Sequence, residues 1–167
     1  RLVAGDAEAR WVTIPEGKTA SQIAQILGEK GFCGEDEFRE LTHRKPKHLG
    51  VALPVSRASL EGYLMPDTYK LPTGVNEKAI AQVMLRNWQD KILKPNKALF
   101  SKSGLTPDKA VIIASMIERE ARVAKDRTLI SSVVRNRLKR KMPLQIDATV
   151  IYALGRHKDR LLFSDLK

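Results

Sequence analysis

Signals that start and stop helices divide this chain into short amphipathic segments, and this punctuation limits the fold more than any other feature. Thr106 and Pro107 are typical of a helix N-terminus, while Gly31, Pro95 and Pro143 follow runs with apolar residues at helical spacing. The longest apolar run is about 8 residues, well below the ~18–20 that a membrane-crossing helix requires. The pattern therefore predicts a globular protein of several short helices with a few strands.

The first part of the chain mixes strand and helix signals. In residues 11–32, the letters VTI alternate as in a strand, PEG predicts a turn, and a helix then starts at Thr19 or Ser21. A second short helix is expected over 35–44, and a loop with at most one strand over 45–59. A returning strand is expected within LEGYLMPDTYKLPTG, residues 60–74.

The second part is predicted to be helical. One helix starts near Asn76 and ends before Pro95, a second starts at Thr106 and Pro107, and a third runs through LISSVVRNRLKRK to Pro143. On the first of these helices one face is expected to be buried, made by Ile80, Val83, Met84, Trp88 and Ile92.

The chain is strongly basic. It has 30 Lys and Arg residues against 19 Asp and Glu, a net charge of +11, which favours an anionic partner such as nucleic acid, acidic lipid or an anionic polymer. The basic run within VVRNRLKRK is typical of a solvated helix end, and nucleic-acid binding is the alternative. Aromatic residues make up only 5% of the chain and no recognised nucleic-acid motif lines up, so we expect no nucleic-acid partner.

Cysteine content and the first residue say little about location. The single Cys33 excludes an intrachain disulfide and fits a cytosolic or a simple exported protein equally well. No ligand spacing typical of zinc occurs, and we expect neither a metal nor a cofactor. The sequence opens with Arg1 instead of Met, so we expect a cut end, with any targeting segment outside this sequence.

A glutamate stands where an apolar helix would be expected to continue. In AVIIASMIERE, residues 110–120, Glu118 falls at about 340° on a helical projection with Val111 at zero, and Ala114 and Arg122 lie nearby. One interpretation is a surface pair with Arg122. The other is a carboxyl that apolar surroundings keep protonated, so that it can donate a proton near neutral pH. Glu120 falls on the opposite side and is a weaker alternative acid.

Three motifs together resemble the YceG-like family of endolytic murein transglycosylases, the MltG type. They are LEGYLMPDTYKLPTG, ASMIEREA and VVRNRLKRKMPLQIDATVIYALG, in the family's order and spacing, and the resemblance covers about Trp11 to Lys167. It implies an α+β architecture with a small LysM-like α/β subdomain in residues 1–75, followed by a mostly helical catalytic region in 76–167. Family members continue past Lys167, so the catalytic region is expected to be C-terminally truncated. Ala148 stands where the family often has Pro.

The resemblance also implies a reaction and its residues. The expected activity is endolytic, non-hydrolytic cleavage of the β-1,4 bond between MurNAc and GlcNAc in peptidoglycan strands, leaving 1,6-anhydro-MurNAc ends. Glu118 matches the family's catalytic residue, which acts first as acid and then as base. The expected substrate-binding residues are Glu61, Tyr63, Asp67, Asn136, Gln145, Asp147 and Thr149.

Other interpretations of these residues stay open. Asp67 would cap backbone amides after Pro66, with the neighbouring aromatic residues in the core, or Asp147 would cap a helix that begins at Ala148. A noncatalytic peptidoglycan-binding module is the alternative function. An inverting hydrolase with Asp67 or Asp147 as its second carboxylate is a further variant, which would release reducing ends.

The resemblance extends to partners and location. It implies peptidoglycan glycan strands as substrate and suggests contact with penicillin-binding proteins of wall synthesis. We expect a single-pass anchor in the cytoplasmic (inner) membrane, through a helix absent from this sequence, with the catalytic region on the periplasmic or outer face.

Overall fold

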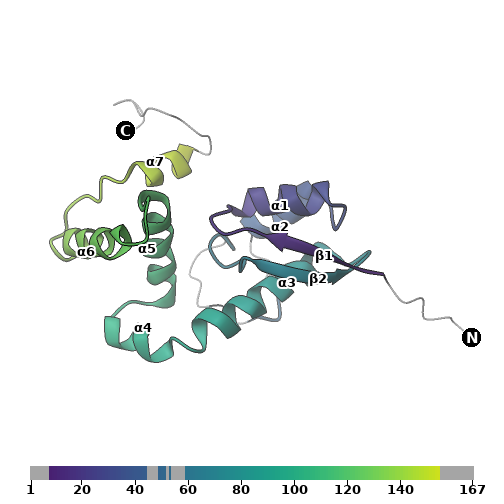
Figure 1. Cartoon of the computed structure of the whole chain (residues 1–167), viewed down its shortest axis with the longest axis horizontal. Helices are drawn as coiled ribbons and strands as arrows, with labels where there is room; N and C mark the ends of the chain where they lie inside the picture. The colour runs from purple at the N-terminus through teal and green to yellow at the C-terminus, as the bar shows by residue number, and fades with distance from the viewer. Residues whose placement is uncertain (1–7, 45–48, 52, 54–58, 155–167) are drawn as a thin grey trace, which may run out of the picture. The chain divides into compact units, whose positions relative to one another are not determined.

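The computed structural model describes residues 8–44, 49–51, 53 and 59–154, and the chain forms two compact units, residues 1–108 and 109–167. Within the described residues it contains a two-stranded antiparallel sheet and seven α-helices (Figure 1). The predicted α+β class is therefore confirmed.

The first unit follows the predicted order of strand, helix, helix, strand and helix. Its elements are β1 Ala9–Ile14, α1 Ala20–Glu29, α2 Glu35–His43, β2 Asp67–Pro72, α3 Glu77–Trp88, the π-helical turn η1 Gln89–Leu93 and α4 Lys97–Ser103. The α5 helix, Pro107–Glu120, starts at the end of this unit and continues in the second, which also contains α6 Asp126–Lys139 and α7 Asp147–Leu154. Most of the loop expected over 45–59 lies outside the described residues.

The sheet forms because both strands alternate apolar and polar residues. The strands pair from Ala9 opposite Pro72 to Ile14 opposite Asp67, so that Val12 and Ile14 face the core. On the outer face, the hydroxyls of Thr13 and Thr68 lie 2.9 Å apart. The returning strand was predicted within 60–74, and β2 confirms it.

Capping fixes the start of α1. The Thr19 side chain accepts a hydrogen bond from Gln22 N at 3.2 Å, and the Gln22 side chain accepts one from Thr19 N at 2.9 Å, which makes a capping box. One face of α1 is buried through Ala20, Ile23, Ala24 and Leu27. Of the two predicted caps, Thr19 is therefore the correct one.

The α3 helix belongs to the packing of the first unit. Its side chains Ile80, Met84 and Trp88 are buried, and Gln82 Nε2 donates to Leu49 O at 2.6 Å. Val83, predicted for the same face, is 42% exposed, so that part of the prediction is wrong. Ile92, also predicted for this face, lies in η1, where no residue is buried; Ala81 and Leu85 are the further buried residues of α3. By packing, the chain divides after Asp108, and the division expected after residue 75 stays a prediction.

The α4 helix was not predicted from the sequence. This helix has seven residues, buries none of them and ends at Gly104, whose φ of 67° is the left-handed conformation that glycine adopts readily. Leu99, 60% exposed, is one of its apolar side chains. Because no buried face recurs at helical spacing, periodicity has nothing to detect here.

The Cys33 thiol of the first unit is predicted to react slowly. Burial, followed by the nearby carboxylates of Glu77 and Glu37, raises the pKa of Cys33 from 9.0 to about 11. At pH 8 this lowers the thiolate fraction by about a hundredfold, and only the thiolate is nucleophilic. Alkylation by iodoacetamide should be at least about tenfold slower in the native chain than in urea. Equal rates in the two conditions would contradict the shielding.

Candidate functional site

Glu118 lies near the C-terminal end of α5 and is open to solvent. Its side chain is 45% exposed, and its Oε2 accepts from Arg127 Nη2 of α6 at 3.4 Å. At this length and exposure the ion pair contributes little to stability. A half-exposed carboxylate on a helix end is accessible to a large polymeric ligand.

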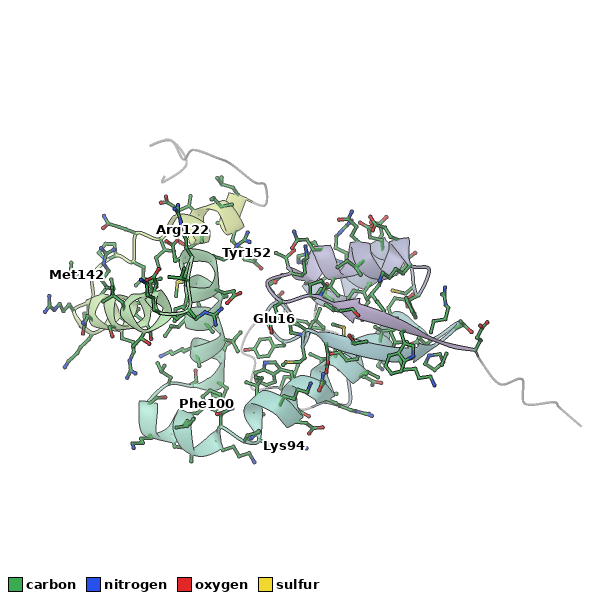
Figure 2. All side chains as sticks on the ribbon, in the orientation of Figure 1. Glu16, Lys94, Phe100, Arg122, Met142 and Tyr152 are labelled. Atoms are coloured by element: carbon green, nitrogen blue, oxygen red, sulfur yellow. The ribbon has the colours of Figure 1, made fainter. Side chains whose placement is uncertain are left out.

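The expected apolar surroundings of Glu118 are not observed. On α5 the buried apolar residues are Ile113 and Met116, which project at about 200° and 140° when Val111 is at zero, opposite Glu118. Ala114, on the same stripe as Glu118, is exposed. The apolar-surroundings prediction is therefore wrong for the described part of the chain. Glu118 does form a surface ion pair, as the other interpretation predicted, but its partner is Arg127 and not Arg122. Arg122 lies just past the end of α5 (Figure 2).

The candidates of the third motif lie on α6, on the loop after it and on α7. Asn136 is exposed on α6, and Gln145, in the loop, has a φ of 50°. Arg137 joins helix to loop, because its Nη1 donates to Leu144 O and lies 3.5 Å from Gln145 Oε1. A non-glycine residue in the left-handed region is uncommon and marks Gln145 as a constrained position.

Asp147 and Thr149 both lie in the first turn of α7. The helix begins at Asp147 itself, one residue earlier than the Ala148 start considered from sequence, and the carboxylate complements the positive end of the helix dipole. The Thr149 hydroxyl donates to Ile146 O at 2.7 Å. Within the described residues, no hydrogen bond links Glu118 to Asn136, Gln145, Asp147 or Thr149.

In the first unit, Glu61 holds the start of α1. Its carboxylate accepts a hydrogen bond from Ala20 N, with Oε2 at 3.0 Å and Oε1 at 3.2 Å. A carboxylate at a helix N-terminus satisfies a free amide and complements the dipole. Glu61 therefore stabilises the start of α1, in addition to the substrate contact predicted for it.

Tyr63 is a core residue. Its ring is fully buried and meets the Trp88 ring edge-on with centroids 4.9 Å apart. Its hydroxyl donates to Asp108 Oδ1 at 2.6 Å, and Asp108 is itself only 9% exposed. The predicted substrate contact for Tyr63 is therefore corrected: a side chain with no exposed surface cannot bind a sugar without unpacking. The alternative interpretation, an aromatic residue in the core, is the correct one.

Asp67 joins β2 to α3 and η1. Its carboxylate accepts from Lys91 Nζ at 2.6 Å, from Asn87 Nδ2 at 2.7 Å and from Thr68 N at 2.9 Å. The hydrogen bond from Lys91, followed by those from Asn87 and Thr68, lowers the pKa of Asp67 to about 2 from 3.8. The backbone-capping interpretation is correct for Thr68 N, and the longer-range partners were not foreseen.

This network makes stability depend on acid pH. Because the pKa of Asp67 is lower in the folded chain than in the unfolded one, its stabilisation is complete above about pH 4 and is lost as the pH falls towards 2. In urea unfolding, the stability difference between the wild type and Asp67→Asn should be largest above about pH 4 and shrink towards pH 2. Glu16→Gln, at an exposed carboxylate in a turn, is the control, with a change below about 0.5 kcal/mol at each pH. A constant Asp67→Asn difference would contradict the assignment.

Three residues that matter for these positions were missed from sequence. Arg127 pairs with Glu118, Asp108 receives the Tyr63 hydroxyl, and Lys91 binds Asp67. Arg127 and Glu118 lie nine positions apart, on different helices, so no helical spacing connects them. Only the position of Asp108 in the first turn of α5 was an available signal, and it indicates a dipole contact, not a buried partner.

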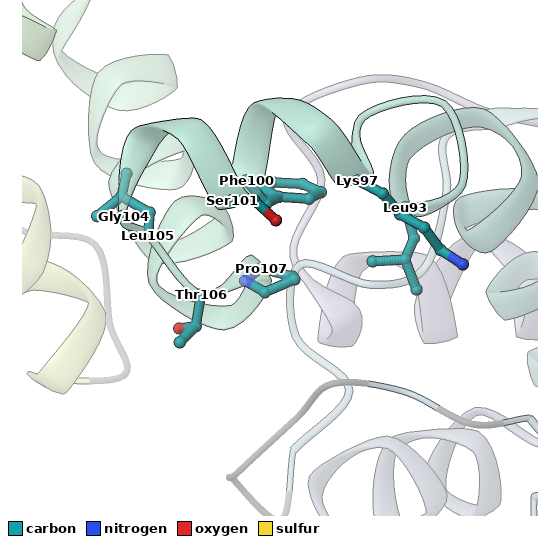
Figure 3. Close-up of a pocket in the computed structure, with 8 residues that line it drawn as sticks. All are labelled: Leu93, Lys97, Phe100, Ser101, Gly104, Leu105, Thr106 and Pro107. Carbon is teal, nitrogen blue, oxygen red and sulfur yellow. The ribbon is translucent and has the colours of Figure 1, made fainter.

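An open hollow of about 470 Å³ lies beside α4 (Figure 3). It is lined by Leu93, Lys97, Phe100, Ser101, Gly104, Leu105, Thr106 and Pro107. None of the predicted site residues is among them, and the lining is mainly apolar. The hollow therefore does not add to the candidate site.

The described residues contain neither a group of metal ligands nor a helix that could span a membrane. No three His, Cys, Asp or Glu side chains are grouped as ligands of one metal ion would be in the described part of the chain. Over the same residues, no helix has the length and the apolar content needed to cross a bilayer.

A family model and two named proteins match the sequence of this chain. The sequence model of the YceG-like family matches residues 1–167. The "Endolytic murein transglycosylase" of Streptococcus pneumoniae serotype 2 (strain D39) is 34% identical over 163 residues, which covers 87% of this chain and 29% of that protein. The protein of the same name from Bacillus subtilis (strain 168) is 42% identical over 109 residues, 65% of this chain and 30% of that protein.

A solved structure is similar over nearly the whole chain. The crystal structure of a yceG-like protein from Listeria monocytogenes has a TM-score of 0.81 and 30% sequence identity, and the match covers 95% of this chain and 57% of that one. The chain spans about three-tenths of the length of the curated relatives named above. With a family match over its whole length, this chain belongs to the YceG-like family.

Proposed function

We propose that this chain is part of an endolytic murein transglycosylase and carries its catalytic acid, Glu118. The observation that carries the proposal is the full-length family match, together with relatives named as endolytic murein transglycosylases at 34% and 42% identity. The solvent-exposed carboxylate of Glu118, on the helix of the second motif, is compatible with binding a polymer as large as a glycan strand.

The proposed reaction needs one carboxyl group and no water. Protonated Glu118 gives its proton to the glycosidic oxygen as the bond between C1 of MurNAc and that oxygen breaks, which releases GlcNAc with a free hydroxyl. The Glu118 carboxylate then takes the proton from the C6 hydroxyl of the same MurNAc, whose oxygen bonds to C1. The ring closes as 1,6-anhydro-MurNAc, and Glu118 is protonated again.

Polar residues of both units are proposed to bind the strand. In the second unit these are Asn136, Gln145, Asp147 and Thr149, which offer amide, hydroxyl and carboxylate groups to sugar hydroxyls and N-acetyl groups. The constrained backbone of Gln145 supports it as a positioned contact. In the first unit, Glu61 and Asp67 are proposed contacts in addition to their structural bonds.

The wider setting is proposed from the family alone. The first part of the chain would act as a LysM-like subdomain, and the whole protein would be anchored in the cytoplasmic membrane with this chain on the outer face. Glycan strands would be the substrate, and penicillin-binding proteins of wall synthesis the partners.

Product analysis tests the reaction. Long purified peptidoglycan strands would be digested with this chain and with a version extended to the length of its relatives, and the products read by mass spectrometry. Ends of 1,6-anhydro-MurNAc from the extended protein would support the proposal. Reducing ends would indicate a hydrolase. Strands that are bound but remain uncut would indicate a noncatalytic binding module.

A further inference from the structure

The positive charge of the chain is concentrated in its second unit. Residues 109–167 carry 14 Lys and Arg against 6 Asp and Glu, whereas residues 1–108 carry 16 against 13. The second unit therefore holds +8 of the net +11. Within it, residues 127–146 contain 6 Lys and Arg and no Asp or Glu. Like charges packed this closely repel one another, so the clustering itself calls for an explanation.

Four cations gather where α6 ends, and we call Arg135, Lys139, Arg140 and Lys141 the basic end of α6. All four are exposed, and none forms an ion pair within the described residues. Arg137, from the same run, differs because it is half-buried and bound to Leu144 O and to Gln145. The basic end is thus free to meet an anionic partner, while Arg137 holds the following loop against the helix.

The backbone conformation at the C-terminal end of α6 favours a functional reason for its cations. Met142 N donates to Arg137 O at 2.9 Å and Lys141 N to Leu138 O at 3.1 Å, the bond pattern of a Schellman motif. The left-handed position of this motif is usually glycine, but here it is Lys141 with a φ of 55°. The helix dipole explains a cation in the last turn, but not a lysine at a position that glycine fills without strain.

Apolar side chains accompany the cations. Leu138 is 47% exposed and Met142 is 48% exposed, on either side of Lys139, Arg140 and Lys141 in the sequence. Exposed cations next to exposed apolar groups match the boundary between lipid headgroups and acyl chains. Peptide carboxylates of peptidoglycan, or nucleic-acid phosphates, would require the charge but not the apolar neighbours.

We propose that the basic end of α6 binds anionic phospholipid headgroups at a membrane surface, with Leu138 and Met142 entering the interface. Each Lys or Arg near such a surface strengthens binding roughly fivefold, so four of them supply a useful but reversible attachment. This attachment is independent of glycan cleavage, and either property can fail without the other.

Vesicle binding tests the surface. The chain would be sedimented with vesicles of phosphatidylglycerol and phosphatidylcholine in equal parts, and with pure phosphatidylcholine vesicles as reference. We expect binding to the anionic vesicles alone, weakening as salt increases. The combined variant Arg135→Gln, Lys139→Gln, Arg140→Gln and Lys141→Gln should bind at least about tenfold more weakly.

A charge-matched variant is the control. Lys18→Gln, Lys30→Gln, Lys78→Gln and Lys102→Gln remove the same charge from exposed positions of the first unit. This variant should bind vesicles within about threefold of the wild type. Equal losses in both variants would mean that only net charge matters and would overturn the proposal, as would absence of binding to anionic vesicles. If the variant at the basic end of α6 loses binding to purified peptidoglycan but keeps its binding to vesicles, the surface binds stem-peptide carboxylates instead.

Lys141→Gly separates binding from folding. Glycine relieves the left-handed conformation, so the urea midpoint should rise, while vesicle binding should weaken by roughly fivefold. A residue with only a structural role would not move the two measurements in opposite directions. Unchanged vesicle binding in Lys141→Gly would exclude this residue from the surface and contradict the explanation of its strain.

Discussion

Glu118→Gln is expected to lower glycan-strand cleavage by about a hundred- to ten-thousandfold, the usual contribution of a general acid–base group. The amide keeps the size of the side chain but cannot donate a proton to the glycosidic oxygen or accept one from the C6 hydroxyl. Because the side chain is 45% exposed and its pair with Arg127 is long, the fold should be unaffected. The measurement is the release of 1,6-anhydro products by the extended protein, with urea unfolding as the check on folding.

Glu120→Gln is the matched control. Glu120 is exposed, lies two residues along the same helix and has the same kind of side chain, so it differs from Glu118 mainly in direction. Its substitution should change the cleavage rate by less than about threefold. If cleavage is instead lost in Glu120→Gln and retained in Glu118→Gln, then Glu120 is the acid. If both variants cleave normally, neither glutamate is the acid.

Tyr63→Ala is expected to lower the free energy of unfolding by about 3–5 kcal/mol, the range for removing a large aromatic side chain from a core. The fully buried ring loses its edge contact with Trp88, and the cavity left behind cannot be filled by neighbours held in α3. Urea unfolding measures the change. Leu99→Ala, at a 60% exposed position of the same unit, should change stability by less than about 0.5 kcal/mol.

Tyr63→Phe tests the hydroxyl alone. It leaves the Asp108 carboxylate, which is almost completely buried, without its 2.6 Å donor, at an expected cost of about 1–3 kcal/mol. Because the ring stays in the core, binding of peptidoglycan per folded molecule should be unchanged. A variant with wild-type stability that binds peptidoglycan poorly would restore the substrate contact first predicted for Tyr63.

Local signals predicted most of the architecture. The alternation through Val12 and Ile14, the cap at Thr19 and the Thr106–Pro107 start each depend on neighbours a few residues away, and the corresponding elements are present. The short α4 was missed because it buries no face. The motif around Glu118 could also be identified from the sequence alone, because a family resemblance is found by comparing residues and requires no knowledge of contacts.

What surrounds each candidate residue was decided only by the tertiary structure. The α5 helix has apolar residues around most of its circumference, so sequence could not show that Ile113 and Met116 face inward while Glu118 faces solvent. Similarly, the hydrogen bond from Lys91 to Asp67 joins residues 24 positions apart, and the one from buried Tyr63 to Asp108 joins residues 45 positions apart. Helix and strand signals act over a few residues, whereas burial and pairing depend on which distant segments pack together. For this reason the sequence determined the helices and strands, and the tertiary structure decided the environment of the site.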